Sequence, residues 1–250
     1  MDCVLELKDV CKNFGGVVVA RDVCFQVYPG ALHGLIGPNG AGKTTILNLI
    51  SGIYEVDAGS IFLLGKDVTN TPSAARARMG LGRTFQSPRF LQRSNILDNL
   101  LLGTDLKDQM GFWKSFLNFK GSDFKKDLDE LMEIADFTFD PEDSIAALPY
   151  GRRKLLEIVR IMLSHPKVML VDEPAAGLNN AETRKAVALL KLATSRNVGV
   201  VLIEHSMDMV MNNCDKITVL NFGCVISEGA PEVVSRDANV IEAYLGKQRN

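Results

Sequence analysis

The sequence predicts an α/β fold, because short apolar segments typical of buried strands alternate with segments of helical periodicity. In the C-terminal half, expected strands at 168–172, 198–204 and 216–220 are separated by expected helices at 181–193 and 207–213. Such alternation is typical of a parallel sheet with crossover helices. A hydrophobic content of 46% over 250 residues can fill a sizeable core. A glycine-rich turn that joins an apolar run to a helix near the N-terminus is the third indication.

The first 30 residues predict antiparallel β structure. Residues that favour strands cluster at 5–10, 17–20 and 23–27, and turns are expected at 14–16 and 28–30. These short strands precede the glycine-rich turn. We therefore expect a small β-rich part at the start of the chain.

The middle of the chain, from about residue 94 to 164, is dominated by helical periodicity. The candidate helices are 95–102, 124–135 and 151–163. They are preceded by an expected strand at 60–64, a short basic helix at 73–79 and a strand at 81–85. An apolar stripe at helical spacing is formed by Phe112, Trp113, Phe116 and Phe119. Local burial is the favoured interpretation of this stripe, and a partner site is the alternative.

The glycine-rich turn reads GPNGAGKTT over residues 37–45, between an expected strand at 31–36 and an expected helix at 45–50. Glycines at this spacing let consecutive backbone N–H groups approach phosphate oxygens at a helix N-terminus. Lys43 would lie against the outer phosphates, and the Thr44 hydroxyl would coordinate Mg²⁺. The expected nucleotide contacts are Gly37, Pro38, Asn39, Gly40, Ala41, Gly42, Lys43, Thr44 and Thr45. The sequence therefore predicts a nucleoside triphosphate site.

Two adjacent acids follow the apolar strand expected at 168–172, at the strand end where open α/β sheets place their ligands. In that position Asp172 would hold Mg²⁺, and Glu173 would act as general base toward the attacking water. An acidic turn capped by Pro174 is the alternative for an isolated pair. The phosphate loop upstream favours the catalytic interpretation.

The composition argues against several classes of protein. Lys and Arg number 28 against 30 for Asp and Glu, the net charge is −2, and no long basic tract indicates a nucleic-acid partner. The 5 cysteines are scattered and form no C-x-x-C pair, so they are interpreted as core residues in a reducing cytoplasm. The apolar runs fall short of the ~20 residues that a membrane-spanning helix needs.

From Leu5 to about Gly229 the chain resembles a nucleotide-binding subunit of the ATP-binding cassette (ABC) transporters. The resemblance implies that two such subunits, of the same or a sister chain, bind two ATP molecules and Mg²⁺ between them in a head-to-tail dimer. It also implies that Phe14 stacks on adenine, that Gln86 reaches Mg²⁺ and senses the membrane partner, and that His205 contacts the γ-phosphate beside Glu173. His33 and His165 lack such a placement and are interpreted as structural.

The chain departs from the family at two motifs. Residues 148–152 read LPYGR where the family usually shows Leu-Ser-Gly-Gly-Gln, so a serine hydroxyl is missing. The Gly151 backbone and the dipole of the following helix still favour an anion. Asn179 stands where the family usually has an aspartate. The resemblance implies contact with ATP for Leu148, Pro149, Tyr150, Gly151, Arg152 and Asn179, and the departures are expected to slow hydrolysis without abolishing it.

With these departures, the motifs of the chain resemble those of the cytoplasmic ATPases of branched-chain amino acid importers. Membrane permease subunits are then expected to dock near 86–93, with the chain cytoplasmic and peripheral at the inner face of the cell membrane. A stand-alone ABC ATPase of a cytosolic assembly system and an ABC ATPase of a urea or lipid transporter remain as alternatives. The expected division of the single domain 1–250 is an antiparallel β subdomain at 1–30 and 53–70, a RecA-like core of mixed or parallel sheet at 31–52 and 165–229, a helical subdomain at 94–164 with an insertion at 103–147, and C-terminal helices at 230–250.

Overall fold

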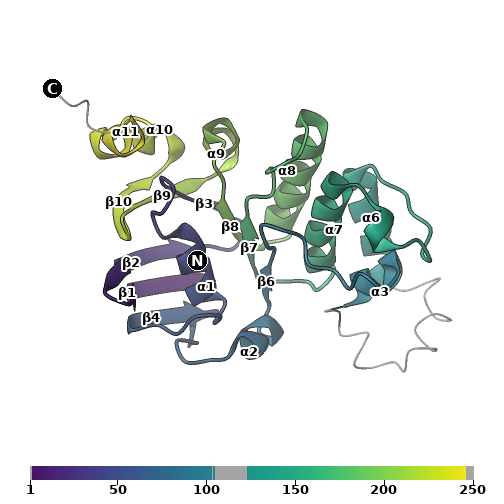
Figure 1. Cartoon of the computed structure of the whole chain (residues 1–250), viewed down its shortest axis with the longest axis horizontal. Coiled ribbons are helices and arrows are strands. Elements are labelled where there is room, and N and C mark those ends of the chain that lie inside the picture. The colour runs from purple at the N-terminus through teal and green to yellow at the C-terminus, as the bar shows by residue number, and fades with distance from the viewer. Residues whose placement is uncertain (1, 103, 105–122, 246–250) are drawn as a thin grey trace. The chain divides into compact units, whose positions relative to one another are not determined.

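The computed structural model describes residues 2–102, 104 and 123–245 and confirms an α/β fold (Figure 1). The aromatic stripe expected at 112–119 lies outside these residues. The chain divides into two compact units. The first comprises Met1–Arg83, Lys167–Glu173 and Ala193–Asn250, and the second Thr84–Pro166 and Pro174–Leu192. The finer division into an antiparallel subdomain, a RecA-like core and C-terminal helices stays a prediction.

A four-stranded antiparallel sheet in the order β2-β1-β4-β5 occupies the N-terminal part of the first unit. Its strands are β1 (Leu5–Phe14), β2 (Val17–Val27), β4 (Ala58–Leu63) and β5 (Lys66–Asp67). The sequence predicted two separate strands at 17–20 and 23–27, whereas the structure contains one. Asp22 adopts a φ of 47° and the register with β1 shifts nearby, so the strand continues through an irregularity rather than ending.

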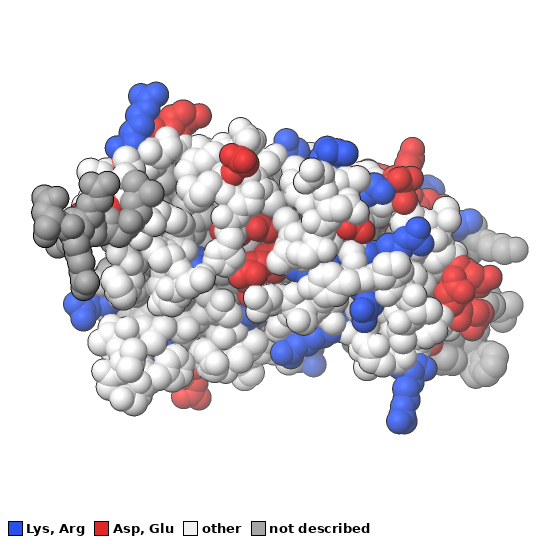
Figure 2. All heavy atoms as spheres, turned by 45° about the horizontal axis from the view of Figure 1, so that its top comes forward, with Lys and Arg blue, Asp and Glu red and all other residues white. Residues whose placement is uncertain are grey.

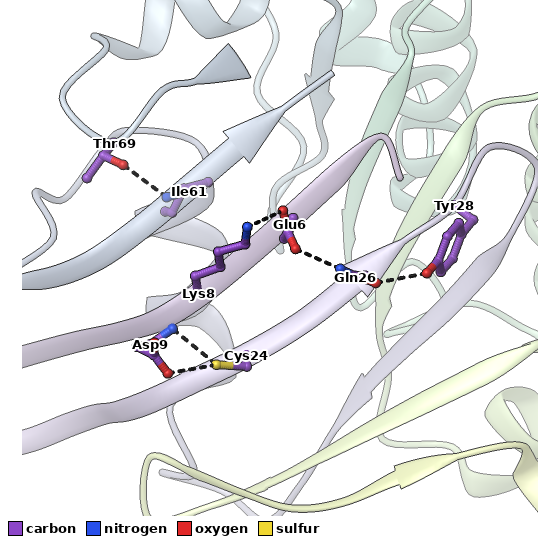
Figure 3. Close-up of polar contacts among 8 residues, drawn as sticks. All are labelled: Glu6, Lys8, Asp9, Cys24, Gln26, Tyr28, Ile61 and Thr69. Atoms are coloured by element: carbon purple, nitrogen blue, oxygen red, sulfur yellow. Dashed lines mark hydrogen bonds and ion pairs between the residues drawn. The ribbon is translucent and has the colours of Figure 1, made fainter. Parts of the chain in front are cut away.

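Polar side chains cross-link the strands of this sheet (Figure 3). Glu6 accepts a hydrogen bond of 2.7 Å from the Gln26 amide and lies 3.2 Å from the Lys8 amine. The Tyr28 hydroxyl donates to Gln26 Oε1 over 2.8 Å. The Cys24 thiol donates to an Asp9 carboxylate oxygen over 3.2 Å. The Gln26–Glu6 and Cys24–Asp9 contacts join β2 to β1 and help to fix their register, whereas the other two contacts join residues two positions apart in the chain.

A six-stranded sheet in the order β10-β9-β3-β8-β7-β6 is the second sheet of the first unit. The pairs β9–β3, β3–β8, β8–β7 and β7–β6 are parallel, and only β10 pairs antiparallel, with β9. The strands are β3 (Leu32–Ile36), β6 (Leu81–Arg83), β7 (Val168–Asp172), β8 (Gly199–Ile203), β9 (Lys216–Asn221) and β10 (Cys224–Gly229). β3, β7 and β8 are buried along their whole length, as parallel strands covered on both faces are.

One apolar cluster joins side chains from both sheets with helix α1 (Lys43–Ile50). Ile46, Leu47, Leu49 and Ile50 of α1 are at most 1% exposed. The burial of this short helix against both sheets fixes the loop that precedes it. The other helices of the unit are α2 (Ser73–Arg78), α9 (Met207–Asn213), α10 (Pro231–Val234) and α11 (Ala238–Leu245).

The second unit is helical in the part of the chain that the structure describes. It contains α3 (Ile96–Leu101), α6 (Asp123–Ala135), the 3-10 helix η2 (Ile145–Ala147), α7 (Tyr150–Met162) and most of α8 (Asn180–Ser195). α7 buries Leu155, Leu156 and Val159. The expected helices at 95–102, 124–135 and 151–163 are confirmed within one residue at each end.

The two histidines interpreted as structural differ in their burial: His33 is buried, whereas His165 is exposed. His33 of β3 is 1% exposed and its Nε2 lies 2.8 Å from the Thr218 hydroxyl. Burial lowers the pKa of His33 to about 4. His165 follows α7 with a φ of 47°, and its Nε2 lies 3.4 Å from an Asp127 carboxylate oxygen. The burial of His33 agrees with a structural role, whereas the role of the exposed His165 stays a prediction.

No helix among the described residues combines the length and the apolarity that spanning a membrane requires. Basic side chains are scattered over the face drawn in Figure 2 and form no continuous area there.

Candidate functional site

The loop between β3 and α1 depends on glycine at two positions. Gly42 is the N-cap of α1, its φ is 103°, and an added Cβ would lie 2.5 Å from the Val19 carbonyl oxygen. A Cβ at Gly37, whose φ is 151°, would overlap the carbonyl oxygen of Leu220. Backbone N–H groups of such a loop point outward at a helix N-terminus. The geometry is that of an anion cradle.

Lys43 begins α1 and is 6% exposed. Its amine donates hydrogen bonds of 2.7 Å to the Gly37 carbonyl and 3.0 Å to the Pro38 carbonyl. Burial lowers the pKa of the Lys43 amine, whereas the charges of Glu173 and Asp172 act to raise it. The loop carbonyls and the two acids therefore surround this cation.

A cavity of about 260 Å³ opens beside the loop. Its lining comes from β2, the loop, the start of α1 and the ends of β7 and β8: Val19, Asn39, Gly40, Ala41, Gly42, Lys43, Thr44, Thr45, Glu173 and His205. The structure thus brings the three expected catalytic residues, Lys43, Glu173 and His205, to one cavity. Residues 39–45 of the phosphate loop line the same cavity. The volume and the donor groups fit the phosphate chain of a nucleotide.

Glu173 and His205 form a pair at this cavity. His205 Nε2 lies 2.9 Å from Glu173 Oε1. The Glu173 backbone N–H donates to the Ile203 carbonyl over 2.9 Å, and its φ is 47°, an uncommon conformation for a residue other than glycine. Such conformations persist where surrounding contacts hold them and cluster at functional sites. The carboxylate is therefore held at the end of β7 by a neighbouring strand and by an imidazole.

The residues expected to hold Mg²⁺ fit that ion by their chemistry. Thr44 is exposed and lines the cavity, while Asp172 ends β7 and is 4% exposed. Among the described residues no group of three or more His, Cys, Asp or Glu side chains is arranged as a metal site. Mg²⁺ needs no such group, because it is usually bound by one or two protein oxygens together with substrate phosphates and waters.

Sequence reasoning missed the residues that support the loop from the C-terminal part of the chain. The Gly223 N–H donates to the Ala41 carbonyl over 3.0 Å, and the Gly223 carbonyl accepts from Arg21 N–H over 2.9 Å. A Cβ at Gly223 would lie 2.6 Å from the Val19 carbonyl oxygen. The sequence signal for this support is the segment 221–225, whose Asn-Phe-Gly-Cys-Val composition indicates a hairpin turn. That turn links the phosphate loop to the antiparallel sheet.

Phe14 ends β1 with 41% of its surface exposed. Its ring packs edge-on against Tyr54, with centroids 5.2 Å apart, and the Lys12 amine lies 5.3 Å from the ring centroid. Lys12 is held in turn by Asp57 over 2.6 Å. Phe14 does not line the 260 Å³ cavity, so its contact with adenine stays a prediction.

The remaining expected nucleotide contacts lie in the second unit. Gln86 does not follow a strand directly, because the pairing of β6 with β7 ends at Arg83. Pro149 is the N-cap of α7, Gly151 is buried, and the Arg152 guanidinium lies 4.9 Å from the Phe137 ring centroid. Leu148 precedes the cap and donates its N–H to the Ile145 carbonyl. Contact between these residues and ATP stays a prediction.

Asn179 has a local structural function as the N-cap of α8. Its side-chain oxygen accepts from the N–H groups of Ala181 (2.9 Å) and Glu182 (3.0 Å). Glu182 returns the contact by accepting from the Asn179 N–H over 3.0 Å. This reciprocal pair is a capping box. The Asn-x-x-Glu spacing of residues 179–182 is the sequence signal of this box.

Comparison with known proteins decides the family. A family model described as ABC transporter matches residues 20–176, which include the phosphate loop, the 148–152 segment and the Asp172–Glu173 pair. The chain belongs to the ABC transporter family. It is an ABC-type transport ATPase that binds nucleotide. A second model, described as branched-chain amino acid ATP-binding cassette transporter, matches residues 224–249.

Relatives of this ABC ATPase cover nearly its whole length. It is 37% identical to the high-affinity branched-chain amino acid transport ATP-binding protein BraF of Pseudomonas aeruginosa, over 98% of each chain. It is 34% identical to the corresponding protein LivG of Escherichia coli, again over 98% of each chain. Among solved structures, the ADP conformation of the ATP-binding cassette MJ1267 is similar with a TM-score of 0.83 and 28% identity, over 99% of this chain and 100% of that one.

Proposed function

We propose that this ABC ATPase powers the import of branched-chain amino acids through separate membrane subunits. The observation that carries the proposal is the 37% identity to BraF over 98% of both chains. The C-terminal match to the branched-chain family model supports the same cargo, because it adds a segment outside the general ABC match. The phosphate loop and the Glu173–His205 pair supply the machinery for hydrolysis.

We assign the chemical step to three side chains around the 260 Å³ cavity. Lys43 neutralises charge on the outer phosphates, and Glu173 accepts the proton of the attacking water. His205 holds the Glu173 carboxylate through the 2.9 Å contact. Mg²⁺, bound by Thr44, Asp172 and Gln86, would supply further positive charge at the phosphates.

The partners follow from the same proposal. A second cassette, the same chain or a sister chain, meets this one head to tail, so that residues 148–152 of one chain contact ATP held by the loop of the other. Membrane subunits dock near residues 86–93, and Phe14 stacks on the adenine ring. The chain is then cytoplasmic and peripheral at the inner face of the cell membrane. BraF and LivG are both described as transport ATP-binding proteins, which supports the place of this chain in a transporter.

The experiment that tests the cargo is deletion of the gene in its own host, followed by uptake of radiolabelled leucine, isoleucine and valine at low concentration. Loss of uptake, restored by the native chain and not by Glu173→Gln, is the expected result. Urea uptake is measured in parallel. Loss of urea uptake with intact leucine uptake would favour the urea transporter, and intact uptake of both would favour an ATPase of a cytosolic assembly system or of a lipid transporter.

A further inference from the structure

Tyr150 stands at the start of α7, where the family usually has a glycine, and it contacts two separate segments of the second unit. Its hydroxyl donates a hydrogen bond of 3.3 Å to the Gln86 backbone carbonyl. Glycine at this position would have no group to make that contact. The hydroxyl therefore ties the segment that carries Gln86 to the first turn of α7.

The ring of Tyr150 lies against Gly177 on its other side. A Cβ added at Gly177 would lie 3.0 Å from Tyr150 Cε1, which is closer than van der Waals contact. Gly177 also has a φ of 77°, which disfavours any other residue there. The turn is closed by a hydrogen bond of 3.0 Å from the Leu178 N–H to the Ala175 carbonyl. The tyrosine ring thus packs on the backbone of the turn that follows Glu173.

The next residue of α7 extends this contact to α8. Gly151 is buried, and a Cβ there would overlap the Glu182 carboxylate, which itself accepts from the Asn179 N–H. Two consecutive residues at the start of α7 therefore lie against the two ends of the 177–182 segment. The neighbouring starts of α7 and α8 can be followed in Figure 1.

We propose that Tyr150 is a positioning residue that couples the Gln86 segment to the 177–182 segment through the start of α7. The proposal rests on the proposed function, in which membrane subunits dock near residues 86–93 and residues 148–152 meet ATP. A displacement of the Gln86 backbone is transmitted to α7 by the hydroxyl, and a displacement of α7 reaches Gly177 through the ring. Tyrosine suits this task because one rigid side chain has a polar end and an apolar face.

The first test is hydrogen exchange on the purified full chain, with variants that separate the two ends of the side chain. Tyr150→Phe removes only the hydroxyl, so exchange of peptides covering residues 84–92 should rise about 2-fold to 10-fold, as loss of one hydrogen bond predicts. Peptides covering 175–182 should stay protected. Tyr150→Ala should raise exchange in both segments. Tyr28→Phe is the matched control, because Tyr28 also donates its hydroxyl to one acceptor, Gln26, at 2.8 Å (Figure 3).

The second test is the hydrolysis of ATP in the transporter assembled with its own membrane subunits. Tyr150→Phe should lower the stimulation of hydrolysis by those subunits about 2-fold to 10-fold, and Tyr150→Ala should lower it further. Unaltered exchange at 84–92 in Tyr150→Phe, or full stimulation in both variants, would overturn the coupling. Failure of the assembled native transporter to move leucine would refute the cargo instead, and it would leave the exchange result unaffected.

Discussion

Glu173→Gln is the most direct test of the catalytic site. Glutamine keeps the length of the side chain, and its amide oxygen can still accept the contact that His205 Nε2 makes with Glu173 Oε1 at 2.9 Å. The backbone bond from residue 173 to the Ile203 carbonyl is untouched, and the φ of 47° costs glutamine about as much as glutamate. The substitution therefore removes the basic carboxylate and little else.

The loss expected from removing a general base is on the order of 10² to 10⁴ in turnover, or about 3 to 5 kcal/mol at the barrier. Phosphate release under saturating Mg-ATP measures turnover, and equilibrium titration with ATP measures binding, which should stay within a few-fold of the native value. Glu55→Gln, an exposed acid-to-amide change, is the control. Native turnover in Glu173→Gln would remove Glu173 from the role of base.

The same variant reports on assembly, because blocked hydrolysis should trap any ATP-bound dimer. We expect light scattering to show a doubled solution mass with Mg-ATP if the chain pairs with itself through its LPYGR segment. A persistent monomer with ATP bound would indicate that a sister chain or the membrane subunits are required.

Three further outcomes follow from the structure. Gly42→Ala should weaken ATP binding at least tenfold, because its Cβ would lie 2.5 Å from a carbonyl oxygen. Gly40→Ala is the comparison, because its Cβ would meet open space and should cost about 1 to 2 kcal/mol of loop strain at most. Titration of both variants with nucleotide measures the difference. Phe14→Ala should weaken ATP binding and leave tripolyphosphate binding unchanged, and equal losses for both would refute adenine stacking. The pKa of His33 is about 4 in the folded chain against 6.5 in the unfolded chain. Its contribution to the free energy of unfolding, about 3 kcal/mol, is therefore present above pH 6.5 and is lost as the pH falls toward 4. Urea unfolding of His33→Gln should lack that part of the pH dependence.

Much of the nucleotide site could be predicted because its residues fall in short continuous motifs. The loop at 37–45 is one continuous turn, and its glycines are required by steric contacts that the motif spacing already implies. The acids at 172 and 173 follow an apolar strand, and the edge at which parallel strands place ligands is a general property of the fold. The meeting of Glu173 and His205 at one cavity follows from the adjacent pairing of β7 and β8.

The supporting contacts could not be predicted, because each joins residues far apart in the chain. Nothing in the local sequence around Tyr54 indicates an edge-on contact with Phe14, since that depends on how the segment after α1 packs beside β1. Likewise, the sequence shows Tyr150 only as a departure from the Leu-Ser-Gly-Gly-Gln motif that is usual in the family. Its contacts with Gln86 and Gly177 required the tertiary arrangement of three segments.

The bond from Gly223 to Ala41 has a consequence for the order in which the protein matures during synthesis. The phosphate loop leaves the ribosome early, but one of its supports is donated by a residue 182 positions later (223 − 41). A nascent chain that stops short of the β9–β10 turn also lacks the link to Arg21. Nucleotide affinity should therefore arise only near the end of translation. Unfinished chains would then not compete with complete subunits for ATP.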